Sequence, residues 1–272
     1  TGTIGGLAAG DYTVTVKYSG DNNYNAAVAT SSFTVSKVDS TMDVTVNDIV
    51  FGGDLTVDAV LPDDATGEVV ITVNGVDYPV PIVDGKATGT IGGLAAGDYT
   101  VTVKYAGDDK YTAVEIAKGV NVAKANPALN VIIDSVDYGN VFTINAVLTG
   151  VNNAPLDTNI IVTVNGKNYI VAIVNGKGTF HADKLAAGSY NFNARFAGSN
   201  NYNEVSDSGK FNVYKVDSAI GITVKDINVG EDAVITVKLF SDATGELTVT
   251  VNGKDYTANV VNGRATVYVS DL

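Results

Sequence analysis

Apolar and polar residues alternate along several short runs of this chain. From Tyr99 to Tyr105 every second residue is apolar, with Thr, Thr and Lys between them. The run from Tyr190 to Phe196 has the same alternation. A period of two predicts a β-strand with one buried face, and the Thr, Val, Ile and Tyr of these runs suit such a surface. No stretch shows sustained helical periodicity, so the pattern predicts an all-β protein.

Short runs of this kind fill the stretch from residue 38 to residue 124, and we count about seven. They predict strands near Asp43–Val46, Leu55–Leu61, Glu68–Val73, Asp77–Val83, Lys86–Ile91, Tyr99–Ala106 and Val114–Val122. Seven short antiparallel strands in a stretch of this length are typical of a Greek-key β-sandwich of the immunoglobulin type.

The turn residues indicate two consecutive hairpins in the middle of each unit. Asn-Gly and Asp-Gly dipeptides favour type I′ turns, which join adjacent antiparallel strands. They occur at Asn74-Gly75, Asn165-Gly166 and Asn252-Gly253, and again about ten residues later at Asp84-Gly85, Asn175-Gly176 and Asn262-Gly263.

Two prolines lie within one of the expected strands. Pro79 and Pro81 are two residues apart in the run Asp77–Val83. Proline has no N–H to donate, so a strand that holds both residues belongs at the edge of a sheet with the missing donors facing solvent. We therefore expect Asp77–Val83 to be an edge strand.

The chain is built from internal repeats. The segment Thr1–Tyr18 is identical to Thr88–Tyr105, and Thr179–Phe196 is a third version. These markers predict two complete repeats, 38–124 and 125–215. Residues 1–37 form the C-terminal part of another repeat, and residues 216–272 form the N-terminal part of a fourth.

One repeat is four residues longer than the other. Phe51 and Tyr138 are 87 residues apart, whereas Asn74 and Asn165 are 91 apart. The extra residues therefore lie between these markers, and the loop composition of Gly150–Asn159 makes it the place we expect.

The sequence thus predicts tandem immunoglobulin-like Greek-key β-sandwiches with about seven strands per repeat. Residues 1–37 and 216–272 together amount to one repeat. An array of two complete units holds these ends apart, so we expect that they do not complete each other within one molecule.

Composition narrows the classes of function. The chain has a net charge of −13 and a pI near 4.3. Its negative surface repels the phosphate backbone of a nucleic acid, so no nucleic-acid partner is expected. The chain has no cysteine, which excludes disulfides and thiol chemistry. No apolar run reaches the length of about 20 residues that spans a bilayer. The chain begins and ends within a motif and is expected to be a segment of something longer.

The motif from Gly93 to Tyr111, GLAAGDYTVTVKYAGDDKY, resembles the bacterial and archaeal Ig-like repeats of large adhesin-like cell-surface proteins. The motif consists of Leu-x-Ala-Gly-x-Tyr followed by Tyr-x-Gly-Asp-x-x-Tyr, and it recurs at Leu7–Tyr24. It also recurs at Leu185–Tyr202, where the first Tyr and the Asp of the second part are replaced by Phe196 and Ser199. The resemblance covers essentially the whole chain. It implies an Ig-like fold and an extracellular, surface-attached location, and it implies little about a ligand.

Three equivalent tyrosines follow the Ala-Gly step, namely Tyr12, Tyr99 and Tyr190. They indicate a tyrosine corner, in which the hydroxyl donates to the backbone of the preceding connection; a ligand-stacking role is the alternative. A second set, Tyr24, Tyr111 and Tyr202, ends the Gly-x-x-x-Tyr loops. These residues are expected to anchor the loop to the sandwich, with a sugar-stacking platform as the alternative.

Acidic residues gather at several loops and raise a calcium hypothesis. The candidates are Asp21, Asp108-Asp109, Asp63-Asp64, Asp39 and Asp217. Calcium takes six to eight oxygens, no D-x-D-x-D-G loop occurs, and the third copy has Ser199 and Asn200 at the loop position. We therefore interpret the acids as solvated surface charge, and we expect no metal and no cofactor.

Other chemistry has little to build on. The single histidine, His181, stands on an expected strand of one repeat, so we expect no catalytic residues and no enzyme activity. A Lys–Asn isopeptide bond at Lys37, Lys124 or Lys215 is the remaining covalent possibility, although these lysines are better explained as strand-end residues.

The leading interpretation is a non-catalytic stalk or spacer of an extracellular adhesin-like surface protein, whose partners are neighbouring repeats of a longer chain. The alternative is a glycan- or protein-binding Ig-like module that uses loop tips or a sheet edge, with Gly150–Asn159 as its most distinctive surface. A homophilic role through open strand edges is a third possibility.

Overall fold

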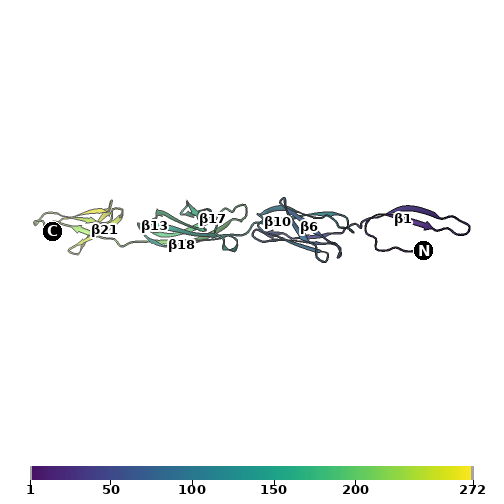
Figure 1. Cartoon of the computed structure of the whole chain (residues 1–272). Helices are drawn as coiled ribbons and strands as arrows, with labels where there is room; N and C mark the ends of the chain where they lie inside the picture. Colours follow the sequence, from purple (N-terminus) through teal and green to yellow (C-terminus); the bar gives the residue numbers. More distant parts are fainter. Residues whose placement is uncertain (1, 271–272) are drawn as a thin grey trace. The chain divides into compact units, whose positions relative to one another are not determined.

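The structure is a computed structural model and describes residues 2–270 of the chain. It is all-β in this range, apart from one short 3₁₀ turn. The strands form several separate sheets, drawn in Figure 1, and each group of sheets is a small sandwich or a part of one.

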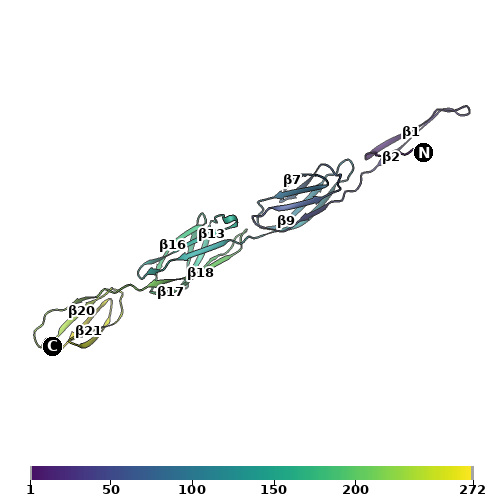
Figure 2. The same ribbon diagram turned by 90° about the horizontal axis from the view of Figure 1, so that it is seen from below.

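The first sandwich consists of two antiparallel sheets. The larger sheet also contains one short strand, β4, that pairs in parallel with β10. The order is β3-β5-β8 in the smaller sheet and β4-β10-β9-β6-β7 in the larger one, to which β7 and β9 of Figure 2 belong. The strands are β3 (Asp43–Val46), β4 (Ile49–Val50), β5 (Leu55–Val60), β6 (Glu68–Val73), β7 (Val76–Pro81), β8 (Lys86–Ile91), β9 (Gly97–Tyr105) and β10 (Val114–Ala123).

Side chains from both sheets form the core of this sandwich. Leu55 and Val57 of β5 are fully buried, as are Ile71 of β6 and Val101 and Val103 of β9. The alternating residues of each strand face solvent, as the sequence pattern predicts.

The strands predicted from the sequence are present with bounds that shift by one or two residues. The predicted run Asp77–Val83 ends at Pro81, because Val83 instead exchanges both backbone hydrogen bonds with Lys86 across the Asp84-Gly85 turn. The position of β7 at the end of the sheet confirms the predicted edge strand. The sequence reading missed β4, two residues that pair in parallel with β10.

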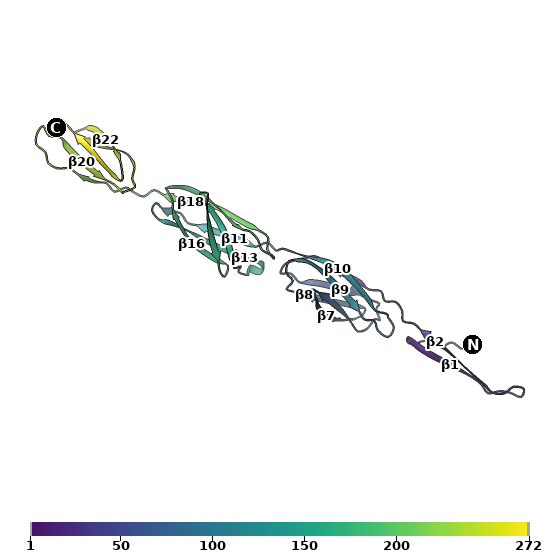
Figure 3. The same cartoon turned by 90° about the horizontal axis from the view of Figure 1, so that it is seen from above.

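The second sandwich repeats this topology. Its sheets have the orders β11-β13-β16 and β12-β18-β17-β14-β15. Figure 3 labels β11, β13, β16 and β18 of this sandwich. The strands are β11 (Ala128–Ile133), β12 (Val136–Asp137), β13 (Val141–Thr149), β14 (Thr158–Val164), β15 (Lys167–Ile173), β16 (Lys177–Lys184), β17 (Gly188–Phe196) and β18 (Val205–Tyr214). The rings of Phe142 and Phe211, one from each sheet, lie 5.1 Å apart and join the two layers.

The two ends of the chain contain only parts of this topology. β1 (Gly10–Tyr18) and β2 (Ala27–Val35) form a two-stranded sheet. The C-terminal part has the orders β19-β20-β23 and β21-β22. Its strands are β19 (Gly221–Thr223), β20 (Ala233–Lys238), β21 (Gly245–Val251), β22 (Lys254–Val260) and β23 (Arg264–Val269). Among the described strands, β1 pairs with β2 alone, and that the two ends do not complete each other within one chain stays a prediction.

The predicted type I′ turns are confirmed by the backbone. The first residue of each dipeptide has a positive φ, from 49° to 52°, and the glycine that follows is also positive. Asparagine and aspartate tolerate this left-handed conformation better than most residues, which is why they recur at these sites.

Candidate functional site

The best-defined group of polar side chains lies in the loop between β9 and β10. Gly107 begins the loop with a φ of +84°, and an added Cβ would lie 2.6 Å from the carbonyl oxygen of Tyr111. Glycine is therefore required here both for its conformation and for the close approach of the backbone. The tight turn places the side chain of the next residue, Asp108, beside the backbone N–H groups of Lys110 and Tyr111.

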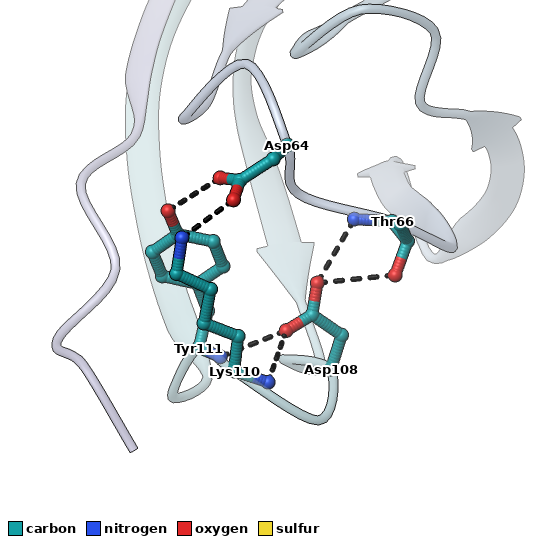
Figure 4. Close-up of polar contacts among 5 residues, drawn as sticks. All are labelled: Asp64, Thr66, Asp108, Lys110 and Tyr111. Carbon is teal, nitrogen blue, oxygen red and sulfur yellow. Dashed lines mark hydrogen bonds and ion pairs between the residues drawn. The ribbon is translucent and has the colours of Figure 1, made fainter. Parts of the chain in front are cut away.

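The carboxylate of Asp108 holds two loops together (Figure 4). One oxygen accepts the backbone N–H groups of Lys110, at 2.8 Å, and of Tyr111, at 2.7 Å. The other oxygen accepts the N–H of Thr66 at 2.9 Å and its hydroxyl at 3.1 Å. Thr66 belongs to the loop before β6, so Asp108 ties together two loops at the same end of the sandwich.

A second carboxylate lies beside the first. Asp64 accepts the hydroxyl of Tyr111 at 2.6 Å and pairs with the ammonium group of Lys110 at 2.5 Å (Figure 4). The Lys110 nitrogen also lies 5.0 Å from the centroid of the Tyr111 ring. The Asp64–Lys110 ion pair is exposed, so it contributes little to stability on its own.

These contacts shift the ionisation of the group. Burial opposes the charge of Asp108, but hydrogen bonds from Thr66, Tyr111 and Lys110 hold the pKa of this carboxyl well below its usual range. The Lys110 ammonium, and then the Tyr111 hydroxyl, lower the pKa of Asp64. Burial, and then the nearby Asp108 carboxylate, raise the pKa of Tyr105 to about 12. Both carboxylates therefore stay charged at neutral pH.

The same turn occurs in the other two copies of the loop. In the N-terminal hairpin, Asp21 accepts the N–H groups of Asn23 at 2.7 Å and Tyr24 at 2.9 Å. In the second sandwich, the hydroxyl of Ser199 accepts the corresponding N–H of Tyr202 at 3.2 Å. A serine can thus replace the aspartate, which shows that capping of the turn is the shared task at this position.

This geometry bears on the calcium hypothesis. Both oxygens of Asp108 already accept two hydrogen bonds each, and Asp64 is engaged by Lys110 and Tyr111. Within residues 2–270, no three His, Cys, Asp or Glu side chains are placed to hold a metal ion. The arrangement suits a locked turn better than a cation site.

The predicted tyrosine corners are confirmed. The hydroxyl of Tyr12 donates to the carbonyl of Ala8 at 2.8 Å, and Tyr99 donates to Ala95 at 3.0 Å. Tyr190 donates to Ala186 at 2.9 Å. These hydroxyls bond the backbone four residues upstream, as a corner requires.

The loop tyrosines behave as anchors where a sandwich is present to receive them. Tyr111 is buried with 7% of its surface exposed, whereas Tyr24 of the isolated N-terminal hairpin is 70% exposed. The hydroxyl of Tyr202 accepts the N–H of Val151 at 3.3 Å, within the inserted loop. That loop contains the 3₁₀ turn η1 (Val151–Asn153), closed by a bond from the N–H of Gly150 to the carbonyl of Ala154 at 2.8 Å.

The two remaining candidates from the sequence are the single histidine and the isopeptide bond. His181 is exposed on β16, with its Nδ1 3.0 Å from the Thr143 hydroxyl of the neighbouring strand, in a cross-strand pair. An isopeptide bond needs a buried carboxyl group to assist it, and no charged side chain is buried within residues 2–270. The structure therefore does not supply the environment that such a bond requires.

Sequence reasoning missed Thr66 and the pairing of Asp64 with Lys110. The Asp-x-x-Tyr spacing was the available signal, because an aspartate readily accepts the N–H groups two and three residues ahead. Nothing in the spacing indicates that a loop more than 40 residues upstream supplies Thr66.

The strand order and the layered sheets define the chain as a series of immunoglobulin-like β-sandwich units. Neither a family model nor a curated protein sequence matches the chain. Among solved structures, it is similar to invasin, a bacterial integrin-binding protein, with 14% identity, 85% of this chain and 55% of that chain covered, and a TM-score of 0.45.

Two further structures extend the comparison. Titin domains A168–A170 share 12% identity over 85% of this chain and 88% of theirs, with a TM-score of 0.42. Fibronectin(III)-like modules of CbhA from Clostridium thermocellum share 15% identity over 64% of this chain and 95% of theirs, with a TM-score of 0.29. These neighbours are β-sandwich domains of the same general fold.

Proposed function

We propose that this chain is a non-catalytic spacer segment in the stalk of an extracellular, adhesin-like surface protein. The observation that carries this proposal is the threefold recurrence of one structural device. Each copy has a tyrosine corner and a capped Asp or Ser turn, and the hydroxyl or carboxylate groups concerned bond to the protein's own backbone. The polar side chains that repeat in register therefore support the fold of each unit.

The spacer role also agrees with the acidic composition of the chain. A net charge of −13 opposes non-specific association of a repeated sheet protein over most of its surface. Between residues 2 and 270, no helix is long and apolar enough to cross a membrane.

Single-molecule stretching tests the spacer proposal. We expect one unfolding event for each of the two sandwiches, each of which releases about 30 nm of chain at about 3.6 Å per residue. Events of this length, together with no saturable binding on glycan or host-protein arrays, agree with a spacer. A chain that extends smoothly without such events would contradict it.

The alternative is a binding module, and one observation favours it. The inserted loop of the second sandwich has two consecutive non-glycine residues with positive φ, Asn152 and Asn153, at 54° and 57°. Such a conformation is uncommon, and the N–H of the preceding residue, Val151, donates to the hydroxyl of Tyr202. Saturable binding of a glycan or protein by the chain, lost when residues 151–154 are deleted, would favour this function over the spacer.

A further inference from the structure

The two complete sandwiches protect the same edge of their larger sheets in different ways. In the first sandwich the edge strand is β7, and in the second it is β15. The register of each hairpin makes Pro79 equivalent to Ile170 and Pro81 equivalent to Ala172, because each pair lies at the same distance from its Asn-Gly turn. The prolines of β7 thus have no counterpart in β15.

The hydrogen-bond pattern shows which backbone groups the prolines affect. In the equivalent turn at Asn175-Gly176, the flanking residues Val174 and Lys177 exchange both backbone bonds, at 2.9 and 3.1 Å. Bonded and non-bonded positions alternate from such a pair along an antiparallel ladder. From the closing pair Val164–Lys167, the backbone groups of residues 168, 170 and 172 therefore point away from β14.

The outer edge of β15 is accordingly open to another strand. In β7, proline removes the outward N–H at two of the three equivalent positions, which is a common way to block an edge. In β15, Asn168 and Ile170 keep both outward groups. Ala172 keeps its outward N–H, while its carbonyl lies close to β16, since a Cβ added at Gly178 would be 2.6 Å from that oxygen.

The side chains beside this edge are apolar. Ile170 is 63% exposed, and its cross-strand partner Ile161 is 46% exposed. The corresponding pairs are Val70–Pro79 in the first sandwich and Thr248–Thr257 in the C-terminal part. An exposed pair of isoleucines at an unblocked edge is a feature of the second sandwich that its two relatives lack.

Charge indicates what covers this edge. The β14–β15 hairpin, residues 158–173, has no acidic residue in a chain with 30, and Lys167 is its single charged side chain. The equivalent hairpins carry Glu68 and Asp77, or Glu246 and Asp255. Copies of a chain with net charge −13 repel each other over most of their surface, and this strip lets two of them approach without opposing like charges.

We propose that β15 pairs antiparallel with β15 of a second copy, with the two-fold axis at Ile170. The two Ile170 residues then exchange both backbone hydrogen bonds, and each Ala172 N–H reaches the Asn168 carbonyl of the other copy. On the solvent face, Ile161 and Ile170 of both copies form one continuous apolar strip. The contact is short, so a single pair is weak and gains strength where several chains stand side by side.

The first test measures self-association of the full chain by analytical ultracentrifugation over a wide concentration range. We expect the average mass to rise with concentration from 28.1 kDa toward twice that value. The variant Ile170→Pro/Ala172→Pro copies the residues that β7 already accommodates, and we expect its dimer dissociation constant to rise at least tenfold. Ile170→Lys keeps the backbone donor but opposes two cations, and we expect it to weaken the dimer as well.

The second test determines the register. The chain has no cysteine, so Ile170→Cys introduces a unique thiol that lies opposite its copy within the Cα separation of a disulfide, about 5.5 Å. In the matched variant Asn168→Cys, the thiols are offset by four residues, about 13 Å along the strands. We expect Ile170→Cys to form disulfide dimers much faster than Asn168→Cys under mild oxidation.

Three results would overturn the proposal. They are a wild-type mass that stays at the monomer value at every concentration, an association that the proline pair and Ile170→Lys leave unchanged, and equal cross-linking by the two cysteine variants. Circular dichroism of each variant, compared with the wild type, confirms that the sandwich is intact before its association is interpreted.

Discussion

At the scale of single residues, Asp108 and Ser199 perform the same task with different chemistry. Each caps the turn that leads from one long strand to the next, but only the aspartate carries a charge that depends on pH. Because hydrogen bonds depress the pKa of Asp108 in the folded state, its ionised form stabilises the first sandwich. The two sandwiches therefore differ in their response to acid at this position.

We expect Asp108→Ala to lower the free energy of unfolding of the first sandwich by about 1–3 kcal/mol at pH 7. The contribution of a carboxyl with a depressed pKa is present above its unfolded pKa of about 3.9 and is lost as the pH falls toward the folded value. The deficit of the variant should thus shrink between pH 5 and pH 2. Hydrogen exchange, which follows each sandwich separately, measures this, and a deficit that is constant with pH would contradict the charge argument.

The control for this experiment is Ser199→Ala in the second sandwich. It removes a cap of the same geometry with no titratable group, so its effect should not change with pH over the same range.

The tyrosine corners give a second prediction at this scale. Tyr99→Phe and Tyr190→Phe each delete a hydroxyl that donates to a backbone carbonyl, and each should destabilise its own sandwich by about 1 kcal/mol or more. Tyr12→Phe deletes the same bond from the N-terminal hairpin and should leave both sandwiches unchanged. Thermal unfolding with unaltered midpoints for Tyr99→Phe and Tyr190→Phe would refute the corner's contribution.

At the scale of elements, one sequence appears in two environments. The residues of β1 and β9 are identical, yet Val103 of β9 is fully buried and its equivalent, Val16 of β1, is 62% exposed. The strand forms in both places, because alternation and β-branched residues suffice for the hairpin. The burial of its apolar face depends on a second sheet, which β1 lacks in the described chain.

This pair of strands permits a matched substitution. Val103→Ala removes buried methyl groups and should cost about 2–3 kcal/mol of stability, from lost transfer free energy and the cavity left behind. Val16→Ala makes the same change in the same local sequence and should alter unfolding by less than about 0.5 kcal/mol. Urea unfolding measures the free energy of unfolding of both variants. An equal decrease in the two variants would contradict the difference in burial.

The sequence predicted most strands of the first sandwich to within two residues, because alternation and Asn-Gly turns are local signals. It did not reveal β4, since two residues are too few to show a period and the pairing with β10 is long-range. The same limit applies to the candidate site. The turn within Asp108–Tyr111 is local, but its bonds to Thr66 and Asp64 arise from the packing of distant loops. The lack of acidic residues in β15 becomes meaningful once the topology shows that this strand lies at the edge of its sheet.

At the scale of the whole molecule, stability is distributed unevenly along the chain. The two sandwiches have buried cores, while the apolar residues of the N-terminal hairpin are largely exposed. Regions with few buried contacts open at lower free energy than regions with a closed core.

Limited proteolysis with trypsin should therefore separate two identical cleavage sites. Lys17 of β1 and Lys104 of β9 have the same neighbours from Thr15 to Tyr18 and from Thr102 to Tyr105. Cleavage after Lys17 should be much faster, because β1 opens without the cost of disrupting a core. Mass spectrometry of the early fragments identifies the site, and equal rates at the two lysines would contradict the unequal stability.

The identity of Thr1–Tyr18 with Thr88–Tyr105 also has a genetic consequence. A crossover between the two coding stretches removes or adds 87 residues, which is one full period, and rejoins the reading frame inside the same strand. Each residue of the product keeps its inward or outward orientation, so the shortened or lengthened chain meets no new folding problem. The number of units is then free to vary among descendants while the architecture of each unit is inherited unchanged.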